Sequence, residues 1–179
     1  MPTSGPATQF LKSEFLTLSV RGALEHSNTY KLASDRVRAQ LRRMLRKKLN
    51  EVANRYKHPV ANRYKYPVSD AEHEANIREV ADAVTSKFAD YLVGRRFRIG
   101  IAQKALNLYL KYLWCAKKIP MPPHCPFDRL IVSKLPKGEQ LNWTQIQTIK
   151  RYKRLVRAAR KKADGLSLAE WELESWEPR

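Results

Sequence analysis

The sequence predicts an all-α fold, a compact multi-helix single domain. Apolar residues recur at helical spacing in several segments, and no stretch alternates apolar and polar residues over the length of a strand. Two Ser-x-x-Glu capping boxes, Ser69 to Glu72 and Ser167 to Glu170, mark helix starts. The length of 179 residues suits one domain. We expect residues 1–165 to form the helical domain and residues 166–179 to form a short acidic helix or tail.

Local signals justify each expected helix in turn. Ser34 and Ser69 are N-cap residues, and Gly94 is a candidate stop for the helix that follows Ser69. Four prolines make residues 119–126 extended or turned. The expected helices cover about residues 10–23, 35–56, 70–91 and 99–116, then a short helix from Asp128, a long basic helix from Trp143 and a short acidic helix toward Trp176.

The net charge points to a polyanionic partner. Lys and Arg number 35 against 17 Asp and Glu, a net +18. Nucleic acid is the first candidate for the partner and an anionic membrane surface the second. The apolar stretch from Ile99 to Cys115 contains too many polar residues for a membrane span, and Met1–Phe10 contains no apolar core of signal-peptide length. We therefore expect a cytoplasmic protein with no membrane partner and no obligate protein partner.

Neither a metal nor a cofactor is expected. Cys115, His124 and Cys125 lack the spacing of a zinc site and a fourth ligand. The two cysteines are expected to be buried as small apolar residues. The sequence contains neither a Walker loop nor a Rossmann fingerprint, so no nucleotide cofactor is implied.

Several basic segments are candidates for contacts with the DNA backbone. They are a basic face from Arg36 to Lys48, the long basic helix with Lys150 and Arg154, and the residues after Gly94. Residues 53–60 and 61–68 form a tandem repeat that is either a tolerated surface loop or a basic arm. The individual candidates are Arg55, Lys57, Arg63, Lys65, Arg95, Arg96, Arg98, Gly100, Arg129, Lys150 and Arg154.

The helix from Gly100 to Lys118 is apolar around most of its circumference, so it belongs in the core. Lys104, Asn107 and Lys111 nevertheless share one face, and Gly100 lies one turn earlier on that face. A ligand could approach the bare backbone at Gly100 closely. The alternative is that the lysines extend to solvent at the helix edge.

Asp128 follows the proline-rich segment. It either caps a helix or is a catalytic carboxylate held by the same N–H groups. From Lys104 to Ala116 a helix rises about 18 Å, and the next twelve residues can span up to about 40 Å. The chain can therefore fold back to place Asp128 beside Lys104. Lys111, about 10 Å further along the helix, remains a rival to Lys104.

These residues resemble a known family. The order of a lysine-bearing apolar helix, a proline-rich turn and Pro-x-Asp-Arg is similar to the catalytic half of helix-hairpin-helix DNA glycosylases, above all the archaeal 8-oxoguanine glycosylases. The matching residues are Gln103-Lys104-Ala105 and Pro126-Phe127-Asp128-Arg129, within residues 94–132. The whole sequence also resembles small bacterial glycosylases that act on phage DNA with glucosylated hydroxymethylcytosine.

The resemblance implies that Lys104 attacks the sugar C1′ and that Asp128 stabilises the sugar cation or orients the nucleophile. The expected substrate is double-stranded DNA with a modified base, either glucosylated hydroxymethylcytosine or an oxidised purine. Cleavage by an amine gives a Schiff base, whereas water activated by Asp128 leaves an intact abasic site. Candidates for the base pocket are Gln103, Asn107, Lys111, Trp114 and Phe127, and Tyr109 could also stack on a base.

The sequence departs from the family in its hairpin. The usual Leu-Pro-Gly-Val-Gly is missing, and residues 94–100 stand in its place with two glycines that could offer N–H groups to a phosphate. Two other functions remain open. One is a non-enzymatic DNA- or RNA-binding module, based on charge alone. The other is a helical ribonuclease, which is disfavoured because the four histidines are scattered along the sequence.

Overall fold

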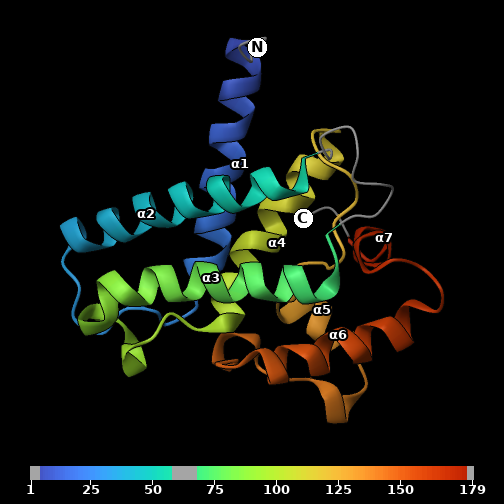
Figure 1. Ribbon diagram of the computed structural model, residues 1–179. Coiled ribbons are helices and arrows are strands. Elements are labelled where there is room, and N and C mark those ends of the chain that lie inside the picture. Colours follow the sequence, from blue (N-terminus) through green and yellow to red (C-terminus); the bar gives the residue numbers. More distant parts are fainter. Residues whose placement is uncertain (1–4, 58–67, 177–179) are drawn as a thin grey trace.

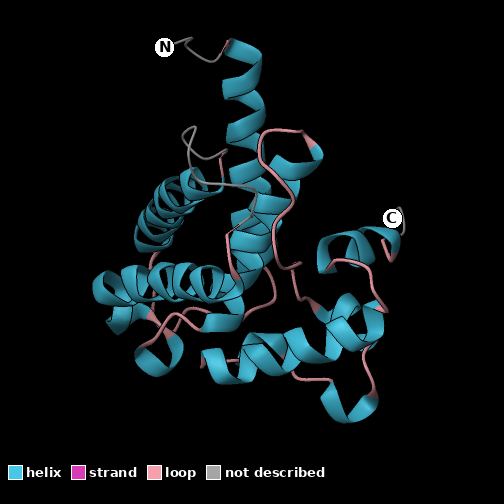
Figure 2. Cartoon of the chain, turned by 45° about the vertical axis from the view of Figure 1, so that its right-hand side comes forward, coloured by secondary structure: helices cyan, strands magenta, loops and turns pink. Residues whose placement is uncertain are grey.

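Two helix pairings organise the fold. The computed structural model describes residues 5–57 and 68–176. In it, α1 (Pro6–Leu24) packs along α4 (Ile99–Cys115), and α2 (Asp35–Ala53) lies antiparallel to α3 (Asp70–Phe88) (Figure 1). The part of the chain that the structure describes is all-α and contains no β-strand (Figure 2). The predicted all-α class is therefore confirmed.

The helix starts that the capping signals predict are confirmed. The Ser34 hydroxyl accepts a hydrogen bond from the Val37 N–H at the start of α2, at 3.4 Å. Complete capping boxes open α3 and α7 (Leu168–Glu174) at Ser69 and Ser167. Asp128 caps α5 (Arg129–Ser133). These starts depend on contacts within four residues, which explains why the sequence alone locates them.

Two predicted helix boundaries are wrong, one at a C-terminus and one at an N-terminus. The third helix ends at Phe88 and continues as the 3₁₀ turns η2 (Ala89–Tyr91) and η3 (Val93–Arg95), so Gly94 is not its C′ residue. The basic helix α6 is Ile149–Ala163 and begins after Thr148, whose hydroxyl accepts from the Arg151 N–H. Trp143 lies instead in the 3₁₀ turn η5 (Trp143–Gln145). Apolar residues spaced three apart fit both an α-helix and a 3₁₀-helix, so this spacing does not distinguish the 3₁₀ turns from the α-helices next to them.

The core surrounds α4, which is buried on most of its surface, as its composition predicts. Short segments complete the chain around it: η1 (Asn54–Tyr56) after α2, and η4 (Lys137–Glu139) after α5. The acidic helix α7 also joins the core through Leu168 and Trp171. Cys125 is buried as expected, but Cys115 is exposed, because it ends α4 at the edge of the fold.

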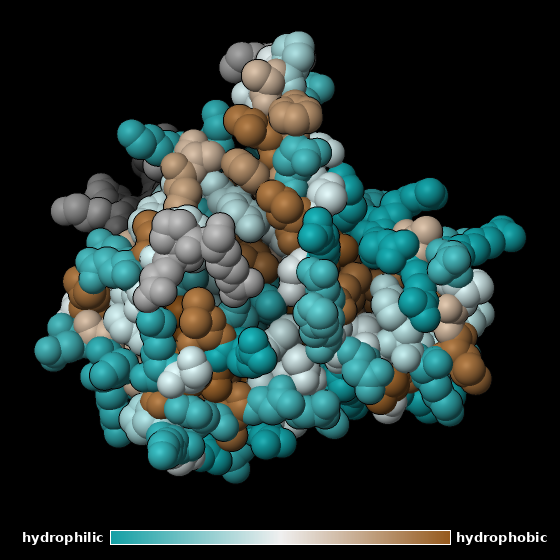
Figure 3. Space-filling model, turned by 180° about the vertical axis from the view of Figure 1, so that it is seen from behind, coloured by the Kyte–Doolittle hydropathy of each residue, from teal (hydrophilic) through white to brown (hydrophobic). Residues whose placement is uncertain are grey.

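The outer surface is mostly polar. Figure 3 shows apolar colour on the projecting N-terminal half of α1, where the Phe10 side chain is 64% exposed. No described helix combines the length and apolar character that crossing a membrane requires. Within residues 5–57 and 68–176, no group of three His, Cys, Asp or Glu side chains is arranged to hold a metal ion.

Candidate functional site

A cavity of about 1310 Å³ lies where the C-terminal end of α1, the N-terminal half of α4 and residues 128–144 meet. Its walls combine charged, polar and apolar side chains from segments far apart in the sequence. They are Gly22, Glu25, His26, Lys104, Asp128, Arg129, Leu130, Val132, Ser133, Gln140, Leu141, Asn142, Trp143 and Thr144.

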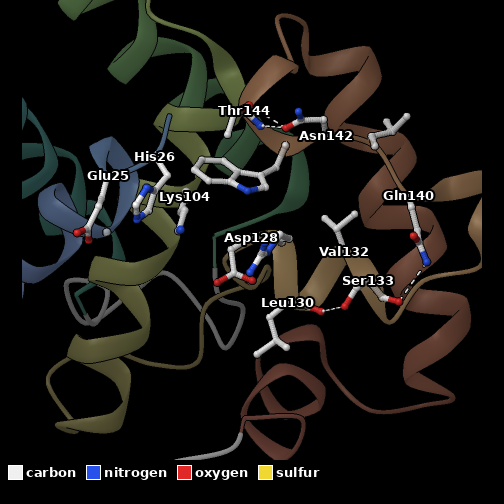
Figure 4. Close-up of a pocket in the computed structure, with 14 residues that line it drawn as sticks. Glu25, His26, Lys104, Asp128, Leu130, Val132, Ser133, Gln140, Asn142 and Thr144 are labelled. Carbon is white, nitrogen blue, oxygen red and sulfur yellow. Dashed lines mark hydrogen bonds between the residues drawn. The ribbon is translucent and has the colours of Figure 1, made fainter. Parts of the chain in front are cut away.

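Lys104 and Asp128 line this same cavity. Figure 4 shows the Lys104 amine and the Asp128 carboxylate pointing into one space, with His26 and Glu25 on the α1 side. The Lys104 Nζ lies 4.4 Å from the centre of the Trp143 ring, a cation–π contact. Asp128 Oδ1 accepts a hydrogen bond from the Ile131 N–H at 3.0 Å, which fixes the carboxylate at the start of α5. The cavity therefore contains an amine, a carboxylate and an aromatic wall.

Gln103, the residue before Lys104, holds the backbone that leads to Asp128. Its Nε2 donates to the Phe127 carbonyl at 2.7 Å, and its Oε1 accepts from the Phe127 N–H at 3.2 Å. Asn107 donates to Gln103 Oε1 at 3.1 Å and to the Cys125 carbonyl at 2.8 Å. Both side chains are fully buried and do not line the cavity. They position the segment before Asp128 instead of contacting a base.

Lys111 lies elsewhere. Its Nζ is 2.9 Å from Glu172 Oε1 and 2.7 Å from Oε2, so it ties α4 to α7 in an ion pair that is largely buried. Burial raises the pKa of the Glu172 carboxyl, and the Lys111 ammonium opposes that rise. Lys111 does not line the cavity. The structure thus separates the two lysines that the sequence left as rivals.

The aromatic pocket candidates on α4 and in the segment before α5 belong to the core. Phe127 and Tyr109 are fully buried, and Phe127 packs edge-on against Tyr152. Trp114 packs against the core and does not line the cavity. The aromatic residue of the cavity is Trp143, which the sequence analysis placed at the start of the long basic helix.

The sequence reasoning also missed the residues from α1. Glu25 and His26 line the cavity just after α1 ends, and His26 has a positive φ of 58° that turns the chain there. A single histidine after a helix carries no local signal of function. Only the packing of α1 on α4 brings these residues to Lys104.

Two of the predicted DNA contacts are contradicted. A Cβ at Gly100 would lie 1.7 Å from the Trp143 carbonyl oxygen, and the Gly100 N–H donates to the Ile146 carbonyl at 2.9 Å. Protein backbone, not a ligand, therefore approaches this glycine. Arg98 is buried, and its guanidinium donates to the carbonyls of Ser27 and Asn28, so it holds the loop after α1.

The remaining candidates differ in accessibility. Arg96, Lys57 and Lys150 are exposed, and Arg129 lines the cavity. Others form ion pairs: Arg95 with Asp90, Arg55 with Glu79 and Arg154 with Glu139. Arg63 and Lys65, with most of the duplicated segment, lie outside the described residues.

Basic residues gather on two helices. On α6, Arg160 and Lys153 form ion pairs with Asp70 and Glu74 of α3, so part of its charge is balanced within the protein. On α2, Arg42, Arg43 and Arg46 line a groove of about 680 Å³ beside α1. Glu25 borders both this groove and the Lys104 cavity, so the groove adjoins the candidate site.

Two histidines come together in the core. The rings of His73 and His124 lie 4.6 Å apart, and both are fully buried. His124 also contacts Tyr152 and Asp70 through its two ring nitrogens, at 2.8 and 3.2 Å. Burial lowers the pKa of His73 well below its usual value. The histidines are scattered along the sequence, and the fold brings His73 and His124 together, but this pair lies inside the core and does not line the Lys104 cavity.

Comparisons with protein-family models, with curated proteins and with solved structures give no match for this chain. The evidence for function is therefore the geometry of the cavity.

Proposed function

We propose that this protein is a DNA glycosylase that extrudes a modified base into the Lys104–Asp128 cavity and cleaves its N-glycosidic bond. The observation that carries the proposal is the cavity itself, which an amine and a carboxylate from separate segments share. Cleavage develops positive charge on the sugar, and a fixed carboxylate stabilises that charge. The helix-hairpin-helix type remains part of the proposal.

The residues divide the chemistry between them. Asp128 is held by the Ile131 N–H and by the Gln103 clamp on Phe127, so its carboxylate is preorganised for the cationic sugar. Lys104 supplies an amine that attacks C1′ as the base departs with the bonding electrons. A water molecule activated by Asp128 is the alternative nucleophile, and it would leave an intact abasic site.

The size of the cavity bears on the substrate. Small-molecule sites usually enclose about 300–1,000 Å³. A cavity of about 1310 Å³ accommodates a base that carries an attached sugar as well as an oxidised purine. Glucosylated hydroxymethylcytosine is therefore the first substrate to test, with antiviral defence as the corresponding role, and 8-oxoguanine is the second.

The experiment incubates duplexes carrying glucosylated hydroxymethylcytosine, hydroxymethylcytosine or 8-oxoguanine with the protein, and alkali then reveals abasic sites. We expect base release from at least one duplex. Asp128→Asn should lower the rate by about 10²–10³-fold, the usual effect of removing one group that stabilises transition-state charge. Asp82→Asn, an exposed position on α3, is the matched control and should leave the rate unchanged. Full activity of Asp128→Asn would contradict the proposal.

A second function is favoured by the charge on α2 and α6. A non-enzymatic nucleic-acid-binding module needs only the basic groove and the exposed face of α6. It predicts salt-dependent binding that Asp128→Asn leaves unchanged, with no base released from any duplex.

A further inference from the structure

The indole of Trp143 is held firmly against α4. The Trp143 carbonyl oxygen occupies the space above Gly100 where a side chain would stand, and the Ile146 carbonyl accepts from the Gly100 N–H. Asn142 Oδ1 accepts from the N–H and the hydroxyl of Thr144, at 3.0 and 2.8 Å, and so closes the turn around Trp143. These contacts therefore fix the backbone that carries the indole, and the ring itself is largely buried.

Lys104 is the movable partner in the contact with this ring. Its ammonium reaches the indole at the end of a flexible four-carbon chain, while its backbone lies one turn beyond Gly100 in α4. Trp143 is only 7% exposed, yet it lines the cavity. A displacement of the ammonium would therefore be the simplest way to uncover the ring.

The ring suits a second occupant. An extruded base stacks on an aromatic face, a contact that every base can make. The same face attracts a cation, and this attraction favours the charged ammonium over the neutral amine. An ammonium has no lone pair, so Lys104 cannot attack while it remains protonated on the indole.

We propose that the extruded base and the Lys104 ammonium compete for the Trp143 ring: the arriving base displaces the ammonium, which then gives its proton to solvent water, and the neutral amine attacks C1′. This inference rests on the proposed glycosylase function with Lys104 as nucleophile. Trp143 would then both stack on the substrate and hold the lysine in its unreactive form until a base is present. An abasic sugar, which brings no base, should find Lys104 still held on the ring.

The test uses abasic-site duplex DNA and sodium cyanoborohydride. The Lys104 amine adds to the C1′ aldehyde, water leaves, and hydride from the reductant converts the iminium to a stable secondary amine that links protein to DNA. Trp143→Leu removes the cation–π contact, so trapping on abasic DNA should become faster by about 3- to 30-fold. The same variant should release base more slowly, by about 10- to 100-fold, because the stacking surface is lost.

Opposite changes in the two rates are the signature, since a merely damaged fold would slow both. Trp143→Phe retains a ring with a weaker attraction for cations and should change both rates less. It also keeps the test decisive should Trp143→Leu fail to fold. The exposed Trp176 is the matched control, and Trp176→Leu should change neither rate.

The outcomes separate the inference from the function. Trapping by folded Trp143→Leu and Trp143→Phe at the wild-type rate or slower, with base release by the wild type intact, would overturn the competition and leave the glycosylase standing. Base release by a wild type that forms no covalent adduct with the modified-base duplex in the presence of cyanoborohydride would also overturn the competition, because water would then be the nucleophile. A wild type that neither releases base nor traps would overturn the function itself, and the competition with it.

Discussion

Lys104 and Lys111 lie two turns apart on α4, and their surroundings differ in kind. Lys104 reaches into an open cavity, where its ammonium lies on an indole ring beside Asp128. Lys111 is enclosed with Glu172 in an ion pair between two helices. A lysine on an apolar helix is thus available for chemistry only where the packing leaves space next to it. The two lysines share one face of α4, so the face does not distinguish them. The residue that each one contacts does: Trp143 for Lys104 and Glu172 for Lys111, both distant in the sequence.

The largest expected effect is on stability, at the Lys111 end. Lys111→Met leaves the buried Glu172 carboxylate without its cation, and breaking a buried pair from one side costs about 3–5 kcal/mol. Lys104→Met should cost less, since Lys104 lines an open cavity and its substitution leaves no buried carboxylate enclosed without its cation as at Glu172. Chemical denaturation measures both. Equal losses would erase the distinction between the two ends of α4.

The pH dependence sharpens that prediction. Because burial raises the pKa of Glu172, the folded protein binds this proton more tightly than the unfolded chain, so this carboxyl lowers stability as pH rises. Without Lys111, the Glu172 carboxyl loses the cation that opposes the effect of burial on its pKa. The stability deficit of Lys111→Met should therefore shrink as the pH falls toward 4 and the carboxyl takes up its proton.

The next-largest effect is expected at Gln103, which connects the Lys104 turn of α4 to the backbone before Asp128. Gln103→Leu leaves the Phe127 N–H and carbonyl without their partner, at a cost of about 3 kcal/mol in total, while Asn107 keeps its bond to the Cys125 carbonyl. Base release should slow while the affinity for DNA stays unchanged, because Asp128 loses its fixed position. Gln147→Leu, at an exposed position before α6, is the control and should behave as wild type. Unchanged kcat in a folded Gln103→Leu protein would exclude a positioning role.

A smaller effect, on the salt dependence of DNA affinity, is expected at the arginines of the α1–α2 groove. Arg42→Gln and Arg43→Gln in the α1–α2 groove should each reduce the slope of log affinity against log salt by about 1 if the side chain contacts a phosphate. Titrations of duplex binding between low and moderate salt measure this slope. Arg78→Gln on α3, on a different surface, is the control. A slope unchanged by all three substitutions would remove the groove from the DNA path.

The smallest effect is at Asp70, a carboxylate that contrasts with Glu172. Hydrogen bonds from His124 and Arg160 lower the pKa of Asp70, so the stability it contributes is present above its unfolded pKa and is lost as pH falls. Asp70→Asn should therefore flatten the loss of stability between about pH 5 and pH 3. Thermal unfolding across this range tests the sign. A steeper loss in the variant would show that Asp70 does not control the acid limb.

The parts of the fold that the sequence predicted depend on local contacts. Ser69, Ser167 and Asp128 cap helices through hydrogen bonds to residues three positions away, so a short pattern suffices to locate them. The path that could bring Asp128 near Lys104 followed from chain length alone. The roles of these two residues in catalysis stay predictions.

The rest of the site depends on distant partners. Glu172 meets Lys111 across 61 positions, and Trp143 meets Gly100 through its backbone carbonyl. Gly100 did signal a close approach, but the sequence could not show that protein backbone fills it. No local pattern marks His26 or Trp143 as cavity residues, because packing alone brings them there.

Gln103 and Lys104 are consecutive residues, and this has a mechanical consequence. The Gln103 side chain holds the backbone next to Asp128, and Lys104 carries the amine, so a single turn of α4 positions both groups of the proposed site. When α4 is displaced by thermal motion, the segment that carries the Asp128 carboxylate moves together with the Lys104 backbone. The distance between the Lys104 backbone and Asp128 therefore changes little when α4 moves, because Gln103 couples the segment before Asp128 to the same helix.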